Sequence, residues 1–318
     1  MPEKVKETLR RQHYALAGKH SAIQICRWAK KSLLDEGECY KQQFYGIKSH
    51  RCCQMSPAVM WCHNKCLHCW RAIELTLGNK MKEKEVDDPK EIIRKCIEAQ
   101  RKMLIGFKGN KKTNLKKLKE AMEPRQFAIS LSGEPTIYPK IGELIEELRK
   151  QGNTTFLVTN GLMPERLKEM QKKKQLPTQL YLSVNAPEKE LFEKFTRPSI
   201  KNAWKKFNET IALFPKLKTR KVVRINLVRG LNMDDNYIPR FAGIIKKARP
   251  DFVEIKAFMS VGYARQRLGY DRMPLHNEIM DFAKKIAKAT GLKVLDEKKE
   301  SRVAVLGKSR KNLKIKSL

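Results

Sequence analysis

The chain has 318 residues, 41% of them hydrophobic and 32% charged, which is enough to bury a core in one large domain or two small ones. No apolar run approaches the roughly 18–20 residues of a membrane span, and the charged N-terminus lacks the apolar segment of a secretory signal, so we expect a soluble, cytoplasmic protein without membrane contact. Sixty-eight Lys and Arg against 34 Asp and Glu give a net charge of +34, which favours a polyanionic partner such as nucleic acid over a merely solvated basic surface.

The first 50 residues begin with a helical pattern and continue with a second helical segment around Ile23–Leu34, before Gly37 and Gly46 interrupt it. From Arg51 onward, short strand-like runs end in polar turns, and most are followed by a helical stretch. The predicted strands are Cys52–Met60, Gln126–Ser132, Thr155–Asn160, Gln179–Asn185, Val222–Val228 and Phe252–Met259. The predicted helices are Pro89–Met103, Ile141–Lys150, Glu165–Lys172, Lys201–Phe214, Tyr237–Ala248 and Asn277–Thr290.

This alternation of strands and helices is typical of βαβ units and a parallel sheet. The strand-like runs are rich in Val, Ile and Leu on both faces, as expected where helices or loops cover each face. Because these repeats are too few to close an eight-stranded barrel, we expect an α/β fold with an open, partial (β/α)6 TIM-like barrel. A doubly wound sheet is the alternative that the periodicity leaves open. In both folds the functional site lies at the C-terminal ends of the strands.

Two segments fall outside the alternation. Phe107–Glu120 is an insertion rich in Lys, Asn and Gly, and Lys298–Leu318 is a basic C-terminal tail with a strand-like run at Arg302–Leu306. Each segment is either a solvated loop or a contact for nucleic-acid phosphates. The chain thus divides into an N-terminal extension (1–50), a (β/α)6 core (51–297) and a basic C-terminal tail (298–318).

The cysteines all lie in the first third of the chain, which favours metal binding over a disulfide framework. Their clearest pattern is a C-x3-C-x2-C run after the first predicted strand, formed by Cys62, Cys66 and Cys69 (the downstream trio). Three thiolates at this spacing bind three irons of a [4Fe–4S] cluster and leave one iron free to chelate a small molecule. With His63 or His68 as a fourth ligand, the run would instead bind zinc.

The downstream trio resembles the cysteine motif of the radical S-adenosylmethionine (SAM) superfamily, which implies SAM as a cofactor and a partial barrel as the fold. Ser132-Gly133-Glu134 ends the second predicted strand and resembles the superfamily's glycine–glycine–glutamate motif, whose backbone carbonyls and acid bind the methionyl ammonium of SAM. Polar residues that end the next two strands contact the SAM carboxylate and ribose in similar enzymes. The SAM-binding residues that the resemblance implies are Ser132, Gly133, Glu134, Asn160, Ser183 and Asn185.

Three further cysteines, Cys26, Cys39 and Cys52 (the upstream trio), follow one another at intervals of 13 residues. With the stretches Met55-Ser56-Pro57, Trp61–Arg71, Glu254–Tyr263 and Met273–His276, they resemble the tRNA 4-demethylwyosine synthase family over nearly the whole chain. The resemblance implies that the upstream trio binds a second [4Fe–4S] cluster with its own open iron. Cys53 is the alternative to Cys52, but adjacent residues of a strand point to opposite faces, so only one of them reaches the cluster. Cys96 lies in an apolar helical pattern and is expected in the core.

The family builds a tricyclic base on N1-methylguanosine 37 in the anticodon loop of tRNA-Phe, with two carbons from pyruvate. The resemblance implies that an electron from an external donor, such as a flavodoxin or ferredoxin, cleaves SAM at the downstream cluster, and that the resulting radical takes hydrogen from the N1-methyl group. We expect no flavodoxin-like domain within this chain. Pyruvate would chelate the open iron of the second cluster or condense with Lys41 as a Schiff base.

Two alternative functions stay open at this point. One is a different tRNA-modifying enzyme of the radical SAM superfamily, which would share the downstream trio but not the upstream one. The other is a non-catalytic RNA-binding protein stapled by zinc, which would explain the charge and the cysteines but not the Ser132-Gly133-Glu134 motif or the repeated βα units.

Overall fold

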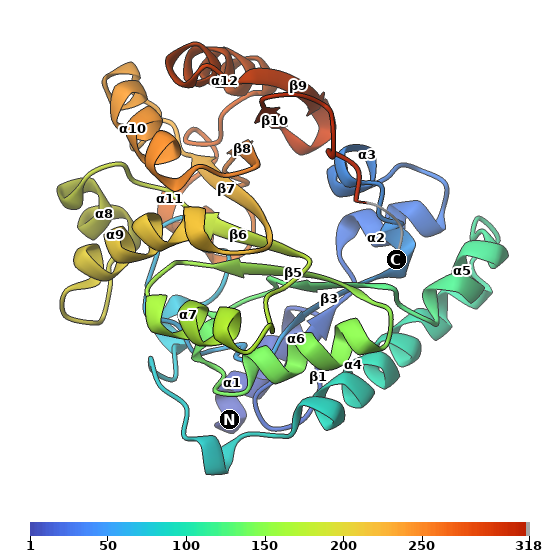
Figure 1. Ribbon diagram of the computed structural model, residues 1–318. Coiled ribbons are helices and arrows are strands. Elements are labelled where there is room, and N and C mark those ends of the chain that lie inside the picture. The colour runs from blue at the N-terminus through green and yellow to red at the C-terminus, as the bar shows by residue number, and fades with distance from the viewer. Residues whose placement is uncertain (316–318) are drawn as a thin grey trace.

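The strands form one ten-stranded sheet in the computed structural model, which describes residues 1–315 (Figure 1). Their order across the sheet is β1-β2-β3-β4-β5-β6-β7-β8-β10-β9. The strands are β1 Ala15–Leu16, β2 Ala22–Gln24, β3 Cys52–Ser56, β4 Gln126–Ile129, β5 Thr154–Thr159, β6 Gln179–Ser183, β7 Arg220–Leu227, β8 Phe252–Ala257, β9 Lys293–Lys298 and β10 Val303–Gly307. Strands β3 to β8 pair in parallel, and the flanking strands pair antiparallel. All six predicted strands are therefore present, in the predicted parallel arrangement.

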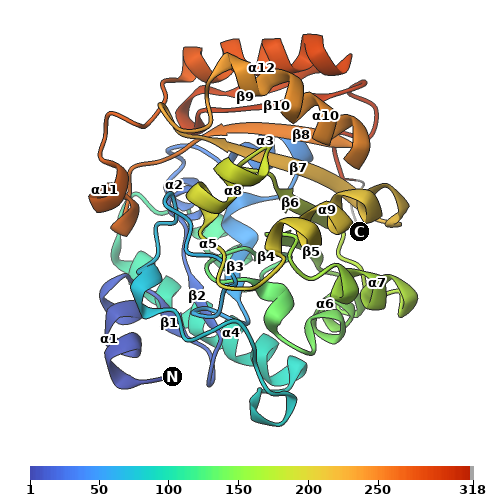
Figure 2. The same ribbon diagram turned by 90° about the vertical axis from the view of Figure 1, so that its left-hand side faces the viewer.

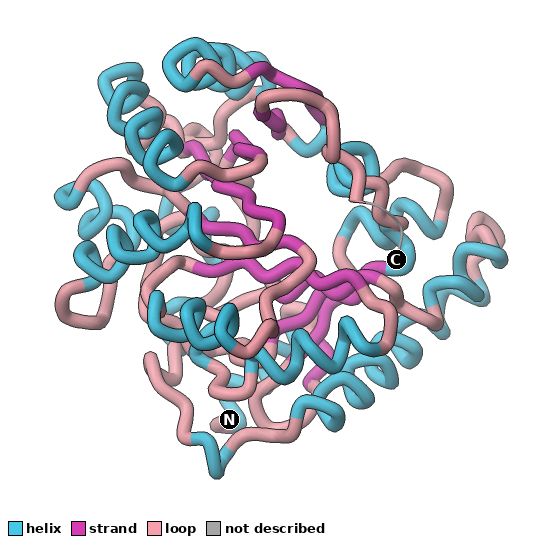
Figure 3. Tube along the Cα trace, viewed as in Figure 1, coloured by secondary structure: helices cyan, strands magenta, loops and turns pink. Residues whose placement is uncertain are grey.

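The helices connect successive strands and surround the sheet (Figure 1; Figure 3, helices in cyan and strands in magenta). They are α1 Glu3–Arg11, α2 Arg27–Leu33, α3 Tyr40–Tyr45, α4 Pro89–Leu104, α5 Leu115–Ala121, α6 Ile141–Lys150, α7 Pro164–Lys172, α8 Lys189–Thr196, α9 Ala203–Leu213, α10 Ile238–Ala248, α11 Tyr263–Leu268 and α12 His276–Thr290. The six predicted helices correspond to α4, α6, α7, α9, α10 and α12 and are confirmed.

One face of the sheet carries all six of these crossover helices. Met55, Ile129 and Leu157 stand side by side in the strand register and belong to the same large apolar cluster as the buried faces of α4, α6, α7, α9, α10 and α12. A doubly wound sheet would distribute its crossover helices over both faces. The arrangement is therefore that of an open, partial (β/α) barrel, with β1 and β9 as its two edges.

The opposite face of the sheet lines the interior of this partial barrel. Phe156, Tyr181 and Phe252, near the N-terminal ends of their strands, pack against Tyr45 of α3 and fill the interior at that end. Farther toward the C-terminal ends of the strands, polar side chains line the interior, including Ser183 of β6 and Arg224 of β7. Apolar packing thus closes one end of the barrel and leaves the C-terminal end for a site.

The segments outside the alternation differ from expectation. Part of the predicted helix Ile23–Leu34 is strand β2, because Ile23 is buried and pairs with Met55 of β3, and α2 begins only after Cys26. The insertion Phe107–Glu120 contains helix α5, packed against α2, rather than a solvated loop. Strand β3 ends at Ser56, before Pro57, which has no N–H to donate to a ladder.

Both ends of the chain join the central sheet. Strands β1 and β2 come from the N-terminal extension and pair with β3, whereas β10 comes from the basic tail and pairs with β8; the two pairs lie at opposite ends of the sheet (Figure 2). The strand-like run at Arg302–Leu306 is therefore confirmed as β10. The last residues of the tail, 316–318, lie outside the described residues. Among residues 1–315, no helix has both the length and the apolar character that crossing a membrane requires.

Candidate active site

A cavity of about 490 Å³ opens at the C-terminal ends of β3 to β8. Every site residue predicted from the sequence lines it, although these residues come from elements far apart in the chain. They are Cys26, Cys39, Lys41, Cys52, Cys62, Cys66, Cys69, Ser132, Gly133, Glu134, Asn160, Ser183 and Asn185. The two cysteine trios, the strand-end polar residues and Lys41 thus face one shared space.

The downstream trio lies on the loop that follows β3. Backbone hydrogen bonds anchor this loop at both ends: Cys62 N donates to Gly78 O over 2.9 Å, and Leu67 N donates to Phe195 O over 3.0 Å. Burial raises the pKa of the Cys62 thiol to about 11 and also raises that of Cys66. A bound cation offsets this cost, because thiols become thiolates when they coordinate a metal.

The upstream trio is held by the ends of short elements. Cys26 and Cys39 are the N-cap residues of α2 and α3, and their Sγ atoms accept hydrogen bonds from Ala29 N (3.3 Å) and Lys41 N (3.5 Å). Amide donors at a helix N-terminus stabilise a thiolate. Cys52 begins β3 and lines the cavity, whereas Cys53 is fully buried in the core on the helix-covered face. The strand alternation predicted for this pair is confirmed, and Cys96 is in the core as expected.

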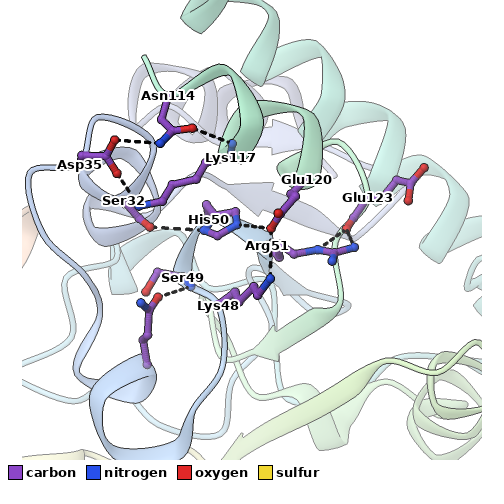
Figure 4. A network of polar contacts seen from close by, with 11 residues as sticks. Ser32, Asp35, Lys48, Ser49, His50, Arg51, Asn114, Lys117, Glu120 and Glu123 are labelled. Carbon is purple, nitrogen blue, oxygen red and sulfur yellow. Dashed lines mark hydrogen bonds and ion pairs between the residues drawn. The ribbon is translucent and has the colours of Figure 1, made fainter. Parts of the chain in front are cut away.

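A polar network ties the elements of the upstream trio together (Figure 4). His50, two residues before Cys52, contacts Glu120 of α5 through Nε2 (2.8 Å) and Ser32 of α2 through Nδ1 (3.5 Å). The neighbouring Ser49 Oγ accepts a hydrogen bond from Cys39 N over 2.9 Å. The insertion that contains α5 therefore helps to hold in place the segments that carry all three cysteines. This role of the insertion was not predicted from the sequence.

The Ser132-Gly133-Glu134 segment is bonded to the chain just ahead of the downstream trio. Ser132 Oγ donates to Val59 O (2.6 Å), and Glu134 N donates to Trp61 O (2.8 Å). Gly133 has φ +74° and lies so close to this segment that a Cβ would stand 1.9 Å from Ala58 O. Only glycine fits this position, because both the backbone angle and the space exclude a side chain.

The Glu134 carboxylate is buried and links the ends of β4 and β5. Its Oε1 accepts hydrogen bonds from Thr136 Oγ1 (2.6 Å) and Thr159 Oγ1 (2.8 Å), and its Oε2 accepts one from Asn160 N (2.7 Å). Burial raises the pKa of Glu134, although these hydrogen bonds oppose the shift. The acid thus fixes the relative positions of two strand ends at the cavity wall.

Asn160 and Asn185, at the ends of two strands, line the cavity, and within the described part of the chain one of their amide donors is unpaired. Asn160 Oδ1 accepts a hydrogen bond from Leu162 N (3.0 Å), but its buried Nδ2 has no hydrogen-bond partner among residues 1–315. Asn185 Oδ1 accepts one from Asn226 N (3.2 Å), and its Nδ2 lies 3.4 Å from His68 Nε2. An unpaired buried donor is costly unless a ligand pairs with it, so the Asn160 amide fits a polar ligand such as the carboxylate of SAM.

Arg224, Lys41 and Lys256 meet at the floor of the cavity, near the carboxylate of Glu254. Arg224 Nη2 lies 2.8 Å from Glu254 Oε2, and Glu254 also accepts hydrogen bonds from the Tyr40 and Tyr45 hydroxyls. Lys41 Nζ lies over the rings of Phe156 and Tyr181, 4.9 and 5.2 Å from their centroids.

The sequence analysis did not identify Arg224 or Lys256 as site residues. Lys256 lines the cavity and donates to Ser301 O over 2.9 Å. Burial, followed by the charge of Arg224, lowers the pKa of Lys256 to about 8; the same two causes lower that of Lys41. Among residues 1–315, Glu254 is the carboxylate that pairs with these cations, so the floor has a net positive charge that suits a small anion.

The spacing of the cysteine side chains distinguishes a single metal ion from an iron–sulfur cluster. Within the described range 1–315, no group of three or more His, Cys, Asp or Glu side chains converges closely enough to hold one metal ion. A [4Fe–4S] cube binds each thiolate at a different iron, so its ligands surround the cube instead of converging on one atom. Each trio offers soft thiolate donors beside an open cavity, a donor set that suits such a cube.

Two family models match consecutive parts of the chain. The one described as "Radical SAM superfamily" matches residues 57–241, and the one described as "Wyosine base formation" matches residues 247–308. The S-adenosyl-L-methionine-dependent tRNA 4-demethylwyosine synthase of Pyrococcus abyssi is 48% identical to this chain over 96% of the chain and 89% of that protein. The protein of the same description from Methanocaldococcus jannaschii is 36% identical over 96% of both chains.

Solved structures match over the same extent. One described as "Structure of TYW1 with a lysine-pyruvate adduct bound" has 35% sequence identity and a TM-score of 0.86, and covers 99% of this chain and 98% of its own. Another, described as "Crystal structure of archaeal TYW1", has 32% identity and a TM-score of 0.79, with 99% and 100% covered. The similarity therefore includes the whole sheet and all the elements that line the cavity.

Proposed function

Because this chain belongs to the tRNA 4-demethylwyosine synthase family of the radical SAM superfamily, we propose that it condenses N1-methylguanosine 37 of tRNA-Phe with two carbons of pyruvate to form 4-demethylwyosine. The observation that carries the proposal is that both cysteine trios and Lys41 face one cavity. A radical formed at one wall and a small substrate held at another can then meet the same base. The alternative function, a non-catalytic RNA-binding protein held together by zinc, does not explain why both cysteine trios and Lys41 face one cavity.

The downstream trio would hold the [4Fe–4S] cluster that all reactions of this superfamily need, with SAM chelated at its open iron. Cluster and SAM together supply a carbon radical that abstracts hydrogen. Ser132 and Gly133 would present backbone carbonyls to the methionyl ammonium, and the Asn160 Nδ2 donor would pair with the SAM carboxylate. Ser183 and Asn185, on the next strand end, would contact the ribose. Since Glu134 already accepts bonds to both oxygens, its main contribution is to hold these strand ends in place.

The upstream trio would hold a second [4Fe–4S] cluster next to Lys41, whose backbone N–H donates to Cys39 Sγ. Lys41 would attack the ketone carbon of pyruvate as the neutral amine, forming a C=N bond and releasing the ketone oxygen as water. Arg224 and Lys256 carry the positive charge that the pyruvate carboxylate requires in a buried site. A related protein, 35% identical, has been solved with a lysine-pyruvate adduct, which supports an amine rather than iron alone as the pyruvate partner.

The remaining partners follow from charge and chemistry. A net charge of +34 suits the phosphates of the tRNA anticodon stem, and the target base in the loop is unpaired, so little energy is needed to place it in the cavity. An external one-electron donor, such as a flavodoxin or ferredoxin, would reduce the downstream cluster. The cytoplasmic location stays a prediction, as does the division of the chain at residues 50 and 297.

The experiment that tests the proposal follows pyruvate carbons into tRNA. The reconstituted protein is incubated anaerobically with SAM, dithionite, tRNA-Phe carrying N1-methylguanosine 37, and pyruvate labelled with ¹³C at one position. We expect nucleoside mass spectrometry to find the label from C2 and from C3 in the product and none from C1, since the C1–C2 bond breaks. A tRNA with unmethylated guanosine 37 is the matched control and should give no product. Product that forms without pyruvate, or that carries C1, would contradict the proposal.

A further inference from the structure

The side chain of Arg71, two residues after Cys69, is buried without a protein partner for most of its donors. It is only 2% exposed, and its Nε and Nη1 atoms have no hydrogen-bond partner among residues 1–315. Within the same range it forms no ion pair with a carboxylate, whereas the largely buried Arg224 pairs with Glu254. A buried guanidinium in this condition is strongly unfavourable unless another anion compensates its charge.

Arg71 follows Cys69 by two residues on the loop of the downstream trio. The groups whose negative charge acts on its guanidinium, once they are thiolates, are Cys69, Cys62 and Cys66. The nearby acid, Glu134, is already bonded to Thr136, Thr159 and the backbone of Asn160, and its charge acts on Cys62. The anion that balances Arg71 is therefore the thiolate set and whatever those thiolates hold.

A second arginine accounts for the shape of the same loop. Arg267 of α11 donates to the backbone carbonyls of Leu67 (3.2 Å) and Arg71 (3.2 Å), and it pairs with Glu74 (3.2 Å). These bonds hold the loop by its main chain, and the charge of Arg267 has a carboxylate partner. Arg71 is thus not needed as the backbone anchor, which leaves its charge to act on the thiols of the downstream trio.

We propose that Arg71 compensates the negative charge of the cluster held by Cys62, Cys66 and Cys69, and thereby raises its reduction potential. The inference rests on the proposed function, because it requires a cluster at this trio. Three thiolates around a [4Fe–4S]²⁺ core carry a net charge of about −1, which becomes about −2 when the external donor adds one electron. A fixed positive charge stabilises the doubly charged form more, so it favours reduction.

The test compares Arg71→Met, which removes the charge at similar length, with Arg71→Lys, which keeps it. Arg267→Met is the matched control, because Arg267 contacts the same loop from α11. After anaerobic reconstitution and iron and sulfide analysis, each protein is titrated electrochemically while the reduced clusters are followed by electron paramagnetic resonance. The downstream cluster is identified by the change of its signal on adding SAM. At a fixed solution potential, we expect the ratio of reduced to oxidised cluster to fall about tenfold in Arg71→Met, a shift of about 60 mV.

We expect Arg71→Lys to stay near wild type, and Arg267→Met to keep the wild-type potential in whatever cluster it retains. Equal potentials in wild type and Arg71→Met, at equal iron content, would overturn the inference. Loss of iron in both Arg71→Met and Arg71→Lys would also overturn it, by making the residue purely structural. If Arg71→Met alone fails to hold iron, Arg71→Gln replaces it in the titration. A wild-type protein without a SAM-responsive cluster would instead refute the proposed function itself.

Discussion

Replacing Cys62, Cys66 or Cys69 by alanine is expected to abolish the cleavage of SAM, with 5′-deoxyadenosine falling to background. Each of these thiols lines the cavity, and the loop offers no other cysteine that could replace a lost ligand within residues 1–315. A cube held by two protein thiolates is not expected to survive reconstitution in a form that chelates SAM. The measurement is chromatography of the nucleoside products after anaerobic incubation with SAM and dithionite, with and without tRNA.

Two other cysteines serve as matched controls for this prediction. Cys96 is fully buried on α4 and remote from the cavity, so Cys96→Ala should still cleave SAM. Cys39→Ala should lose the tRNA product but keep slow SAM cleavage, because it removes a ligand of the upstream trio only. Undiminished 5′-deoxyadenosine formation by Cys66→Ala would show that the downstream trio does not hold the SAM cluster.

Replacing Lys41 by alanine is expected to eliminate the covalent capture of pyruvate. With labelled pyruvate and borohydride, the wild-type protein should acquire one reduced adduct per chain, because hydride converts the imine into a stable secondary amine. Lys41→Ala should acquire none, and its tRNA product should fall to background while SAM cleavage continues. The mass of the intact protein, followed by peptide mapping, measures the adduct and locates it.

The control for Lys41 is the other lysine on the cavity floor. Lys256 is also buried, and its pKa of about 8 makes it the alternative amine, but its Nζ is hydrogen-bonded to Ser301 O. Lys256→Ala should keep the adduct on Lys41 and weaken pyruvate binding through lost positive charge. Lys41→Arg keeps the charge and should still form no adduct. An adduct that persists in Lys41→Ala and disappears in Lys256→Ala would assign the Schiff base to Lys256.

The core of the fold was predictable because its signals are local. Each buried parallel strand is a short apolar run that ends in polar residues, and each crossover helix has an apolar stripe, as in α6 and α12. The edges were less predictable because they depend on tertiary contacts. Ile23 belongs to a strand since β3 lies beside it, and the basic segment with α5 becomes a helix packed on α2. Only the folded chain provides these partners.

Site residues were predictable from the sequence where cluster binding requires a fixed spacing of cysteines, as in the downstream trio. They were also predictable where a polar residue follows a buried strand, as Asn160 does. The charged residues of the cavity floor were not identified from the sequence, although their positions in the predicted strands indicate a function. Arg224 follows Val222 and Val223 in β7, and Lys256 follows Ile255 in β8, positions within a predicted buried strand where a charge must find a partner or a function. The contact between His50 and Glu120 could not be predicted from the sequence pattern, since the two residues are 70 positions apart in the chain.

The most direct test of the central claim, that one cavity is shared by two clusters, is the iron, sulfide and zinc content per chain after anaerobic reconstitution. Wild type is compared with a variant in which Cys26, Cys39 and Cys52 are all alanine, and a Cys53→Ala variant controls for loss of a neighbouring thiol that faces the core. We expect about eight irons in wild type and Cys53→Ala, and about four in the triple variant. About four irons in all three proteins would contradict it, and zinc in place of iron would refute the enzymatic function altogether.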